Sequence, residues 1–226
     1  MLKYLLKISA VLVVVCFVSF PLMAVQAQQG KAKTSLNDVL AKMEQVNSKM
    51  QDMQFDYVQR LKYTDIDEEQ FAQGQIKYKD RNHICIYQKA PQEQYIYVDG
   101  SKITTYVPDN KQAIVENWKN LLNNDELLMT IIDFNKNWKA FKKNHIIELN
   151  NETQTAYVLV VKSKNPKLNW TMYLDLNKDT FLLDSAIYSN KNYTINISLT
   201  DYYIDNNFAD DVFKFVPSED TDIIDF

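Results

Sequence analysis

Apolar side chains recur at three- and four-residue steps between residues 36 and 53, which is the spacing of one face of an α-helix. Ser35 precedes this stripe and Asp38 falls in its first turn, as expected for an N-cap residue and an acidic helix start. The pattern predicts an amphipathic helix over residues 36–53. Two interpretations of its apolar face stay open: it packs into the core, or it covers a cavity in which methionines adapt to a changing occupant. The stripe consists of Leu36, Val39, Leu40, Met43, Val46, Met50 and Met53.

The stretch from Gly74 to Pro108 predicts short strands joined by tight turns. Asp99-Gly100 is a strong hairpin signal, and Asp80-Arg81-Asn82 suits a second turn. Gly74 and Gly100 are two of only three glycines in the chain, so we expect both where the backbone requires glycine. The expected strands occupy residues 75–79, 84–88, 95–98 and 103–106.

The rest of the chain adds further strands and one more helical region. A helix is expected over residues 118–132, with a break near Asn123-Asn124. About eleven strands with two or three helical segments need a strongly curved sheet or a barrel, and the simplest closure places the helices across its concave side. The additional strands are expected at residues 55–63, 113–116, 146–149, 156–162, 168–176, 181–189, 194–203 and 213–216.

Residues 1–27 have the features of a secretory signal: a lysine-bearing start, a short apolar core over residues 8–20, and small residues in Val25-Gln26-Ala27. The alternative is a transmembrane anchor. The apolar run is interrupted by Ser19 and Pro21 and is short for a span of ~20 residues, so cleavage is favoured.

The remaining residues, 28–226, suit one domain with a sizeable core. The full chain has a formal net charge of −4, and losing the leader's two lysines makes it more acidic. An acidic chain with dispersed lysines argues against nucleic acid as a partner and offers no polybasic membrane surface. Cys85 is then the only cysteine, so no intramolecular disulfide is expected.

No catalytic, phosphate-binding or metal-binding motif is found in the sequence, which predicts no cofactor and no metal. His83 and Cys85 share a strand face, and a Cys–His nucleophile pair is one interpretation; a polar residue beside a buried thiol is favoured. Asp175, Asn177 and Asp179 could hold calcium, but they lack the glycine and distal glutamate of the usual loop, so a turn explains them better. Five tyrosines cluster in the central stretch: Tyr78, Tyr87, Tyr95, Tyr97 and Tyr106. They could form the wall of a pocket, or they could be ordinary core and strand-surface residues.

The order of several short motifs resembles the periplasmic outer-membrane lipoprotein carrier (LolA-like) family. The resemblance covers nearly the whole chain after the leader, and it implies an α+β fold: an unclosed antiparallel β-barrel covered by a lid of two or three helices, with an apolar cavity between them. The motifs are Gly74-x-Ile76, Pro91, Val98-Asp99-Gly100, Tyr106-x-Pro108, Phe213-Lys214-Phe215-x-Pro217 and Asp222-Ile223-Ile224.

The resemblance also implies a function without a chemical step. Such a protein would shield lipoprotein acyl chains in the periplasm and deliver them toward the outer membrane. Its partners would be acylated lipoproteins and an inner-membrane lipoprotein-releasing transporter, with an outer-membrane receptor as a further candidate. An envelope lipid-binding or lipoprotein-sensing module on the same fold is the alternative, and an enzyme using Cys85 and His83 is a third. The expected cavity and lid residues are Leu40, Met43, Phe55, Tyr57, Ile76, Tyr78, Arg81, Ile84, Ile86, Ile96 and Val98.

The chain departs from this family at its lid arginine. By spacing, that arginine falls on Asp80, and a second frequent arginine falls on Cys85. Arg81 stands one position later, and its planar five-proton group could fix helix carbonyls or a carboxylate of the lid. The alternative for Arg81 is a solvated turn residue that contributes little.

Residues 1–27 lead to a prediction about processing. The mature protein is expected to begin near Gln28 and to be soluble, because a charged start, a short apolar core and small residues before the cut favour cleavage. N-terminal sequencing of protein from the periplasmic fraction measures this. Recovery of the full-length chain from the membrane would contradict it.

Overall fold

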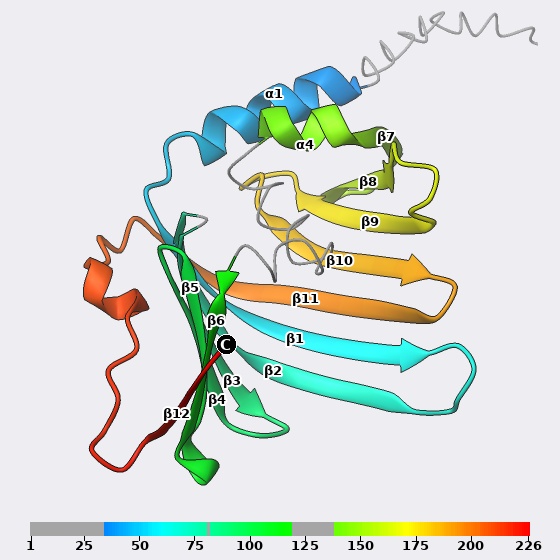
Figure 1. Cartoon of the computed structure of the whole chain (residues 1–226). Helices are drawn as coiled ribbons and strands as arrows, with labels where there is room; N and C mark the ends of the chain where they lie inside the picture. Colours follow the sequence, from blue (N-terminus) through cyan, green and yellow to red (C-terminus); the bar gives the residue numbers. More distant parts are fainter. Residues whose placement is uncertain (1–33, 81, 119–137) are drawn as a thin grey trace, which may run out of the picture. The chain divides into compact units, whose positions relative to one another are not determined.

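Twelve strands form one sheet in a computed structural model that describes residues 34–80, 82–118 and 138–226. The strand order is β12-β6-β5-β4-β3-β2-β1-β11-β10-β9-β8-β7, so the sheet is open and its edges are β12 and β7 (Figure 1). Every pairing is antiparallel except that of β12 with β6. The strands are β1 (Met53–Tyr63), β2 (Glu69–Asp80), β3 (His83–Ala90), β4 (Gln94–Asp99), β5 (Lys102–Val107), β6 (Gln112–Asn117), β7 (His145–Glu152), β8 (Ala156–Ser163), β9 (Trp170–Asn177), β10 (Leu183–Asn190), β11 (Tyr193–Ile204) and β12 (Asp222–Asp225).

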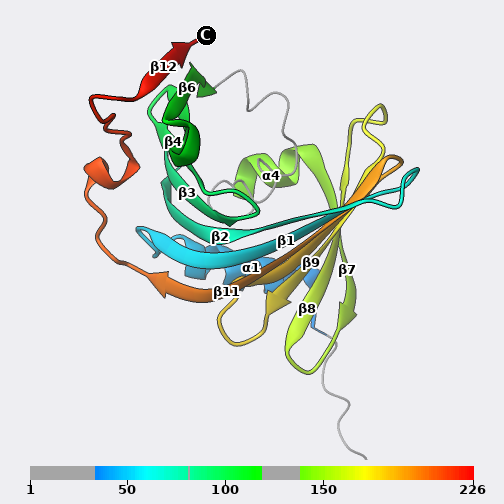
Figure 2. The same cartoon turned by 90° about the horizontal axis from the view of Figure 1, so that it is seen from below.

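The sheet is strongly curved: β1 and β2 bend along their length (Figure 2), and β3 to β6 run steeply across the direction of β9 to β11 (Figure 1). The unclosed, curved antiparallel sheet expected from the sequence is therefore confirmed. Two short 3₁₀ turns complete the described elements, η1 (Pro108–Asn110) and η2 (Asp210–Phe213).

The first predicted helix is confirmed as α1 (Leu36–Asn47), and it is shorter than the apolar stripe. The Ser35 hydroxyl accepts a hydrogen bond from the Asp38 amide at 3.2 Å, which caps its start. The last two methionines of the stripe lie beyond the helix, because the chain turns there to enter β1; both remain buried, at 5% exposure for Met50 and 1% for Met53. Core burial, rather than helical periodicity, accounts for their apolar character.

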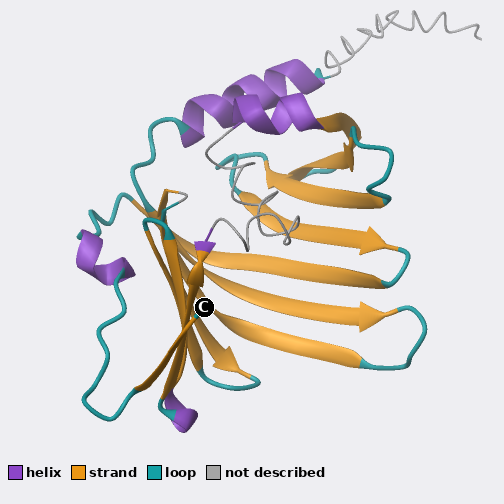
Figure 3. Cartoon of the chain, in the orientation of Figure 1, coloured by secondary structure: helices purple, strands orange, loops and turns teal. Residues whose placement is uncertain are grey.

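A second helix, α4 (Trp138–Asn144), was not predicted. Its Phe141 is fully buried and belongs to the same hydrophobic cluster as the buried face of α1, and Figure 3 shows both helices on the same side of the sheet. The helix expected over residues 118–132 lies, apart from Trp118, outside the described residues. The described part of the chain thus has two α-helices, and a lid of two or three helices is not confirmed.

The predicted Asp99-Gly100 turn connects the two strands of a hairpin, and β2 and β3 also pair, with Asp80 opposite His83. Gly100 joins β4 to β5 with φ of 65°, a left-handed conformation that glycine adopts without cost. The other scarce glycine, Gly74, lies where β2 approaches β3 closely: a Cβ there would come within 1.9 Å of the Tyr87 carbonyl oxygen. The β2–β3 register shifts at this point, so glycine permits a bulge between two strands.

The strand predicted at residues 213–216 is wrong. Residues 210–213 form η2, and the following residues cross the outer face of the sheet unpaired until β12. The apolar residues of this segment recur at every second position because Phe213 is buried and the Phe215 ring contacts two tyrosine rings at a tilt. Alternation reports which side chains face a surface, and it does not report whether the backbone is paired.

We call residues 205–221 the C-terminal strap. It begins at the buried Asp52, which is 1% exposed and accepts hydrogen bonds from the backbone amides of Asn206 at 2.7 Å and Phe208 at 2.9 Å. Farther along, ion pairs join the strap to the sheet, one of them between Lys79 and Asp210 at 2.7 Å. Asp52 therefore fixes the strap where the chain leaves β11.

The strap contact leads to a prediction about stability. Asp52→Asn should lower the free energy of unfolding by about 2–3 kcal/mol, because an amide nitrogen would face backbone N–H donors that a carboxylate now satisfies. Urea denaturation measures the change. Asp67→Asn, in the exposed β1–β2 loop, is the control and should stay within about 0.5 kcal/mol of the wild type. Equal stability of all three proteins would show that Asp52 does not anchor the strap.

Candidate functional site

Cross-strand partners on one face of the sheet line up in two apolar rows. The first is fully buried, with side chains between 1% and 5% exposed, and runs Met53, Tyr78, Ile84, Val98 and Ile103. The second, which we call the isoleucine row, crosses seven strands and runs Phe55, Ile76, Ile86, Ile96, Thr105, Ile114 and Ile224.

The two rows differ in burial. Phe55 is buried at one end of the isoleucine row, at 4% exposure, whereas Ile76, Ile86 and Ile96 are only half-buried and pack against the core from its border. No charged side chain belongs to this row. It is an apolar wall with accessible surface, which an apolar chain could cover with a gain of roughly 25 cal/mol for each Å² removed from water.

The side chains beneath α1 are packed more completely. Leu40 is 5% exposed and Met43 is not exposed at all, and both belong to one continuous core cluster with Phe55 and Tyr57. Burial raises the pKa of Tyr57 to about 12, so its phenol stays neutral at physiological pH. The stripe of α1 faces the same apolar interior as the rows.

Ten predicted site residues therefore share one hydrophobic cluster: Leu40, Met43, Phe55, Tyr57, Ile76, Tyr78, Ile84, Ile86, Ile96 and Val98. The eleventh, Arg81, lies outside the described residues. Sequence reasoning missed Ile114 and Ile224, which continue the row across β6 and β12. The strand expected at residues 113–116 could have indicated Ile114. Ile224 is found only through the parallel pairing of β12 with β6.

The central tyrosines do not form one group. We call the face of the sheet that carries the two rows the inner face. Tyr78 lies on this face, in the buried row. The other four tyrosines alternate with row residues along their strands, so they lie on the opposite, outer face. The inner site is therefore almost purely aliphatic where it is accessible.

The nucleophile interpretation of Cys85 and His83 gains no support from their contacts. Burial raises the pKa of the Cys85 thiol, which favours the unreactive protonated form. The His83 ring nitrogen Nδ1 lies 2.9 Å from an Asp80 carboxylate oxygen, and its ring meets Phe213 edge-on. Within the residues that the structure describes, no hydrogen bond joins the thiol to the imidazole.

Side-chain oxygens at the acidic turn after β9 accept hydrogen bonds from nearby residues of the protein. The Asn177 side-chain oxygen accepts hydrogen bonds from the Asp179 and Thr180 amides at 2.9 and 3.1 Å, and Asp175 accepts one from Ser185 at 2.7 Å. This is the turn that the sequence favoured over a calcium loop. Across residues 34–80, 82–118 and 138–226, no group of three acidic, histidine or cysteine side chains could hold a metal ion.

In the same ranges, no helix combines the length and the apolar character needed to cross a membrane.

The described residues form an open, curved, mostly antiparallel sheet with an apolar inner face. A family model described as "Outer membrane lipoprotein carrier protein LolA" matches residues 48–216. This chain belongs to the LolA family. The family match and the curved sheet confirm the resemblance first drawn from the short motifs.

Several solved structures resemble this chain at low identity. An uncharacterized conserved protein from Thermus thermophilus shares the fold: it is 12% identical with a TM-score of 0.56, covering 85% of this chain and 100% of its own. A LolA superfamily protein from Nitrosomonas europaea is 13% identical with a TM-score of 0.44, covering 80% and 98%. A chain of the Pseudomonas aeruginosa MucA/MucB complex is 16% identical with a TM-score of 0.44, covering 79% and 60%. A search of curated proteins finds no match.

Proposed function

We propose that this protein is a periplasmic carrier that covers the acyl chains of lipoproteins with its inner face and passes them toward the outer membrane. The observation that carries the proposal is the isoleucine row: apolar side chains interrupted only by Thr105, with Ile76, Ile86 and Ile96 half-buried, in a chain of the LolA family. Family membership supports lipid or lipoprotein binding in general, and the transport role is the finer part of the proposal.

Physical chemistry makes such a carrier necessary and limits its design. Each methylene of an acyl chain costs ~0.8 kcal/mol to expose to water, so an acylated protein cannot cross an aqueous compartment unaided. Release demands that the carrier not hold its cargo by strong polar contacts. A wall built from Ile76, Ile86 and Ile96 meets both demands, because dispersed apolar contacts are exchanged for similar contacts with the next acceptor.

A lid completes the proposal. Helix α1 supplies one part, with Leu40 and Met43 turned to the apolar interior. The region 118–132 is proposed as another part, and Arg81 as the residue that holds the closed state. The proposed partners are acylated lipoproteins, an inner-membrane lipoprotein-releasing transporter and an outer-membrane receptor.

No chemical step is proposed. The raised pKa of the Cys85 thiol and the contact of His83 with Asp80 give the Cys–His nucleophile interpretation no support.

The inner-face wall leads to a prediction about cargo affinity. Ile96→Gln should weaken the binding of a fluorescent long-chain fatty acid about tenfold, because an amide in the wall loses its water when the acyl chain covers it. Fluorescence titration, expressed per folded molecule, measures this. Ile187→Gln is the matched control, since Ile187 is 40% exposed and lies on the outer face of β10.

Ile86→Gln should repeat the effect from the neighbouring strand, and urea denaturation of each variant separates lost folding from lost affinity. Equal affinity of the two inner-face variants and the wild type would reject the isoleucine row as the cargo surface.

The transport role has its own prediction. Depletion of the protein in its native host should make lipoproteins accumulate at the inner membrane, because their acyl chains would then have no shelter from water on the way across. Fractionation of the two membranes, followed by quantification of acylated proteins, measures the distribution. Unchanged distribution, together with bound acyl chains in the purified protein, would favour the sensing or lipid-binding module over the carrier.

A further inference from the structure

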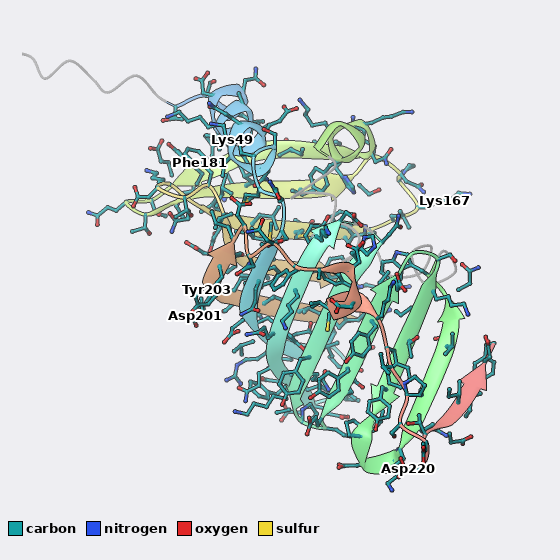
Figure 4. All side chains as sticks on the ribbon, turned by 90° about the vertical axis from the view of Figure 1, so that its left-hand side faces the viewer. Lys49, Lys167, Phe181, Asp201, Tyr203 and Asp220 are labelled. Carbon is teal, nitrogen blue, oxygen red and sulfur yellow. The ribbon has the colours of Figure 1, made fainter. Side chains whose placement is uncertain are left out.

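The outer face of β2, β3 and β4 carries a hollow of about 340 Å³ beneath the C-terminal strap. Its lining residues alternate with the isoleucine row along the same strands, so the two surfaces lie on opposite faces of the sheet. Figure 4 looks onto this face and shows the strap crossing it on the way from Tyr203 to Asp220. The side chains around the hollow include Gln75, Lys77, Tyr87, Tyr95, Tyr97 and Val212.

The tyrosines form a stacked ladder across β3 and β4. Ring centroids of Tyr87 and Tyr95 are 4.9 Å apart at 25° between planes, and those of Tyr95 and Tyr97 are 6.2 Å apart at 12°. Burial raises the pKa of Tyr95 to about 12, and the same effect raises the pKa of Tyr97, so both hydroxyls keep their protons at neutral pH.

An aromatic side chain of an extended segment already sits on this ladder. Phe215 of the strap lies 5.9 Å from Tyr97 and 5.1 Å from Tyr106, centroid to centroid. The segment around it, residues 214–218, belongs to no helix or strand. Tyr97 belongs both to this aromatic contact and to the hollow, which Val212 of the strap and Gln75 and Lys77 of β2 also line.

Lys77 gives the hollow its charge. It is half-buried, and its ammonium lies 5.7 Å from the centre of the Phe208 ring. Among the described residues it makes no ion pair, whereas the neighbouring Lys79 is paired with Asp210 at 2.7 Å. A partly desolvated ammonium beside aromatic rings favours a carboxylate.

We propose that this hollow docks an extended peptide segment of a partner protein that bears an aromatic side chain next to a carboxylate. The aromatic ring packs on the Tyr87–Tyr95–Tyr97 ladder, next to the ring of Phe215, and the carboxylate pairs with the Lys77 ammonium. The volume suits one large ring side chain with its neighbour, and the Lys77 ammonium offers a charge that an acyl chain does not match. This site is additional to the proposed cargo surface and does not depend on it.

The test uses the full mature chain and a blocked tetrapeptide, acetyl-Asp-Phe-Val-Pro-amide, which keeps the Phe-Val-Pro order of the strap and places a carboxylate before it. Isothermal titration should show saturable binding. Tyr95→Leu should weaken it about tenfold through lost stacking, and Lys77→Gln about threefold through a lost half-exposed ion pair. Tyr95→Phe should keep the affinity, because it keeps the ring.

Two controls isolate the contacts. A peptide with Asn in place of Asp should bind the wild-type protein about threefold more weakly than the Asp peptide does. Its affinity for the Lys77→Gln variant should be the same as for the wild type, because in a double-mutant cycle the ion pair is lost only once. Tyr173→Leu and Lys62→Gln remove a ring and a charge from exposed positions on β9 and β1, and should leave peptide binding unchanged.

Absence of saturable binding to the wild type, or equal binding by Tyr95→Leu that folds normally, would overturn the proposal. An N-acetylated disaccharide that binds with sensitivity to Tyr95→Leu, when the peptide does not bind, would overturn it too and assign the hollow to saccharides. The hollow variants should bind the fluorescent fatty acid as the wild type does, so this site and the cargo surface can fail separately.

Discussion

The cross-strand register of β1 to β6 is the constraint on which the rest of this structure depends. Because side chains alternate between faces, one register places isoleucines from β2, β3, β4 and β6 in a single row with Phe55. A slip of one residue in any pair would send that strand's apolar side chains to the other face. The bulge at Gly74 belongs to this register, because only glycine allows the β2 backbone to approach Tyr87 so closely.

The same register gives the sheet two chemically different faces. The inner face is apolar and belongs to the core cluster that includes side chains of α1 and α4. The outer face of β2 to β4 carries tyrosines and lysines, and it is crossed by a strap held at one end by the buried Asp52 carboxylate. The sheet therefore separates an apolar surface from an aromatic, cationic one by the thickness of a single layer.

The aliphatic character of the isoleucine row, to which no charged side chain belongs, fits the proposed handover of acyl chains. Apolar contacts act over area rather than direction, so they hold a chain without demanding one pose. The described polar networks are structural instead: Asp52 ties the strap, and Asn177 closes a turn. Binding would then be decided by accessible apolar area, which Ile76, Ile86 and Ile96 supply at the border of the core.

The sequence by itself determined most of the strands, the Asp99-Gly100 hairpin and the apolar character of the ten predicted site residues that lie in or against the hydrophobic cluster, because alternation, turn chemistry and hydrophobicity are local properties. It overextended α1, since Met50 and Met53 are apolar for core burial rather than for helix periodicity. It also made residues 213–216 a strand, although their alternation comes from packing across a face. Only the tertiary structure decided that Ile224 joins the isoleucine row and that four of the five central tyrosines lie on the outer face. Both outcomes follow from the pairing of strands, which the sequence alone does not specify.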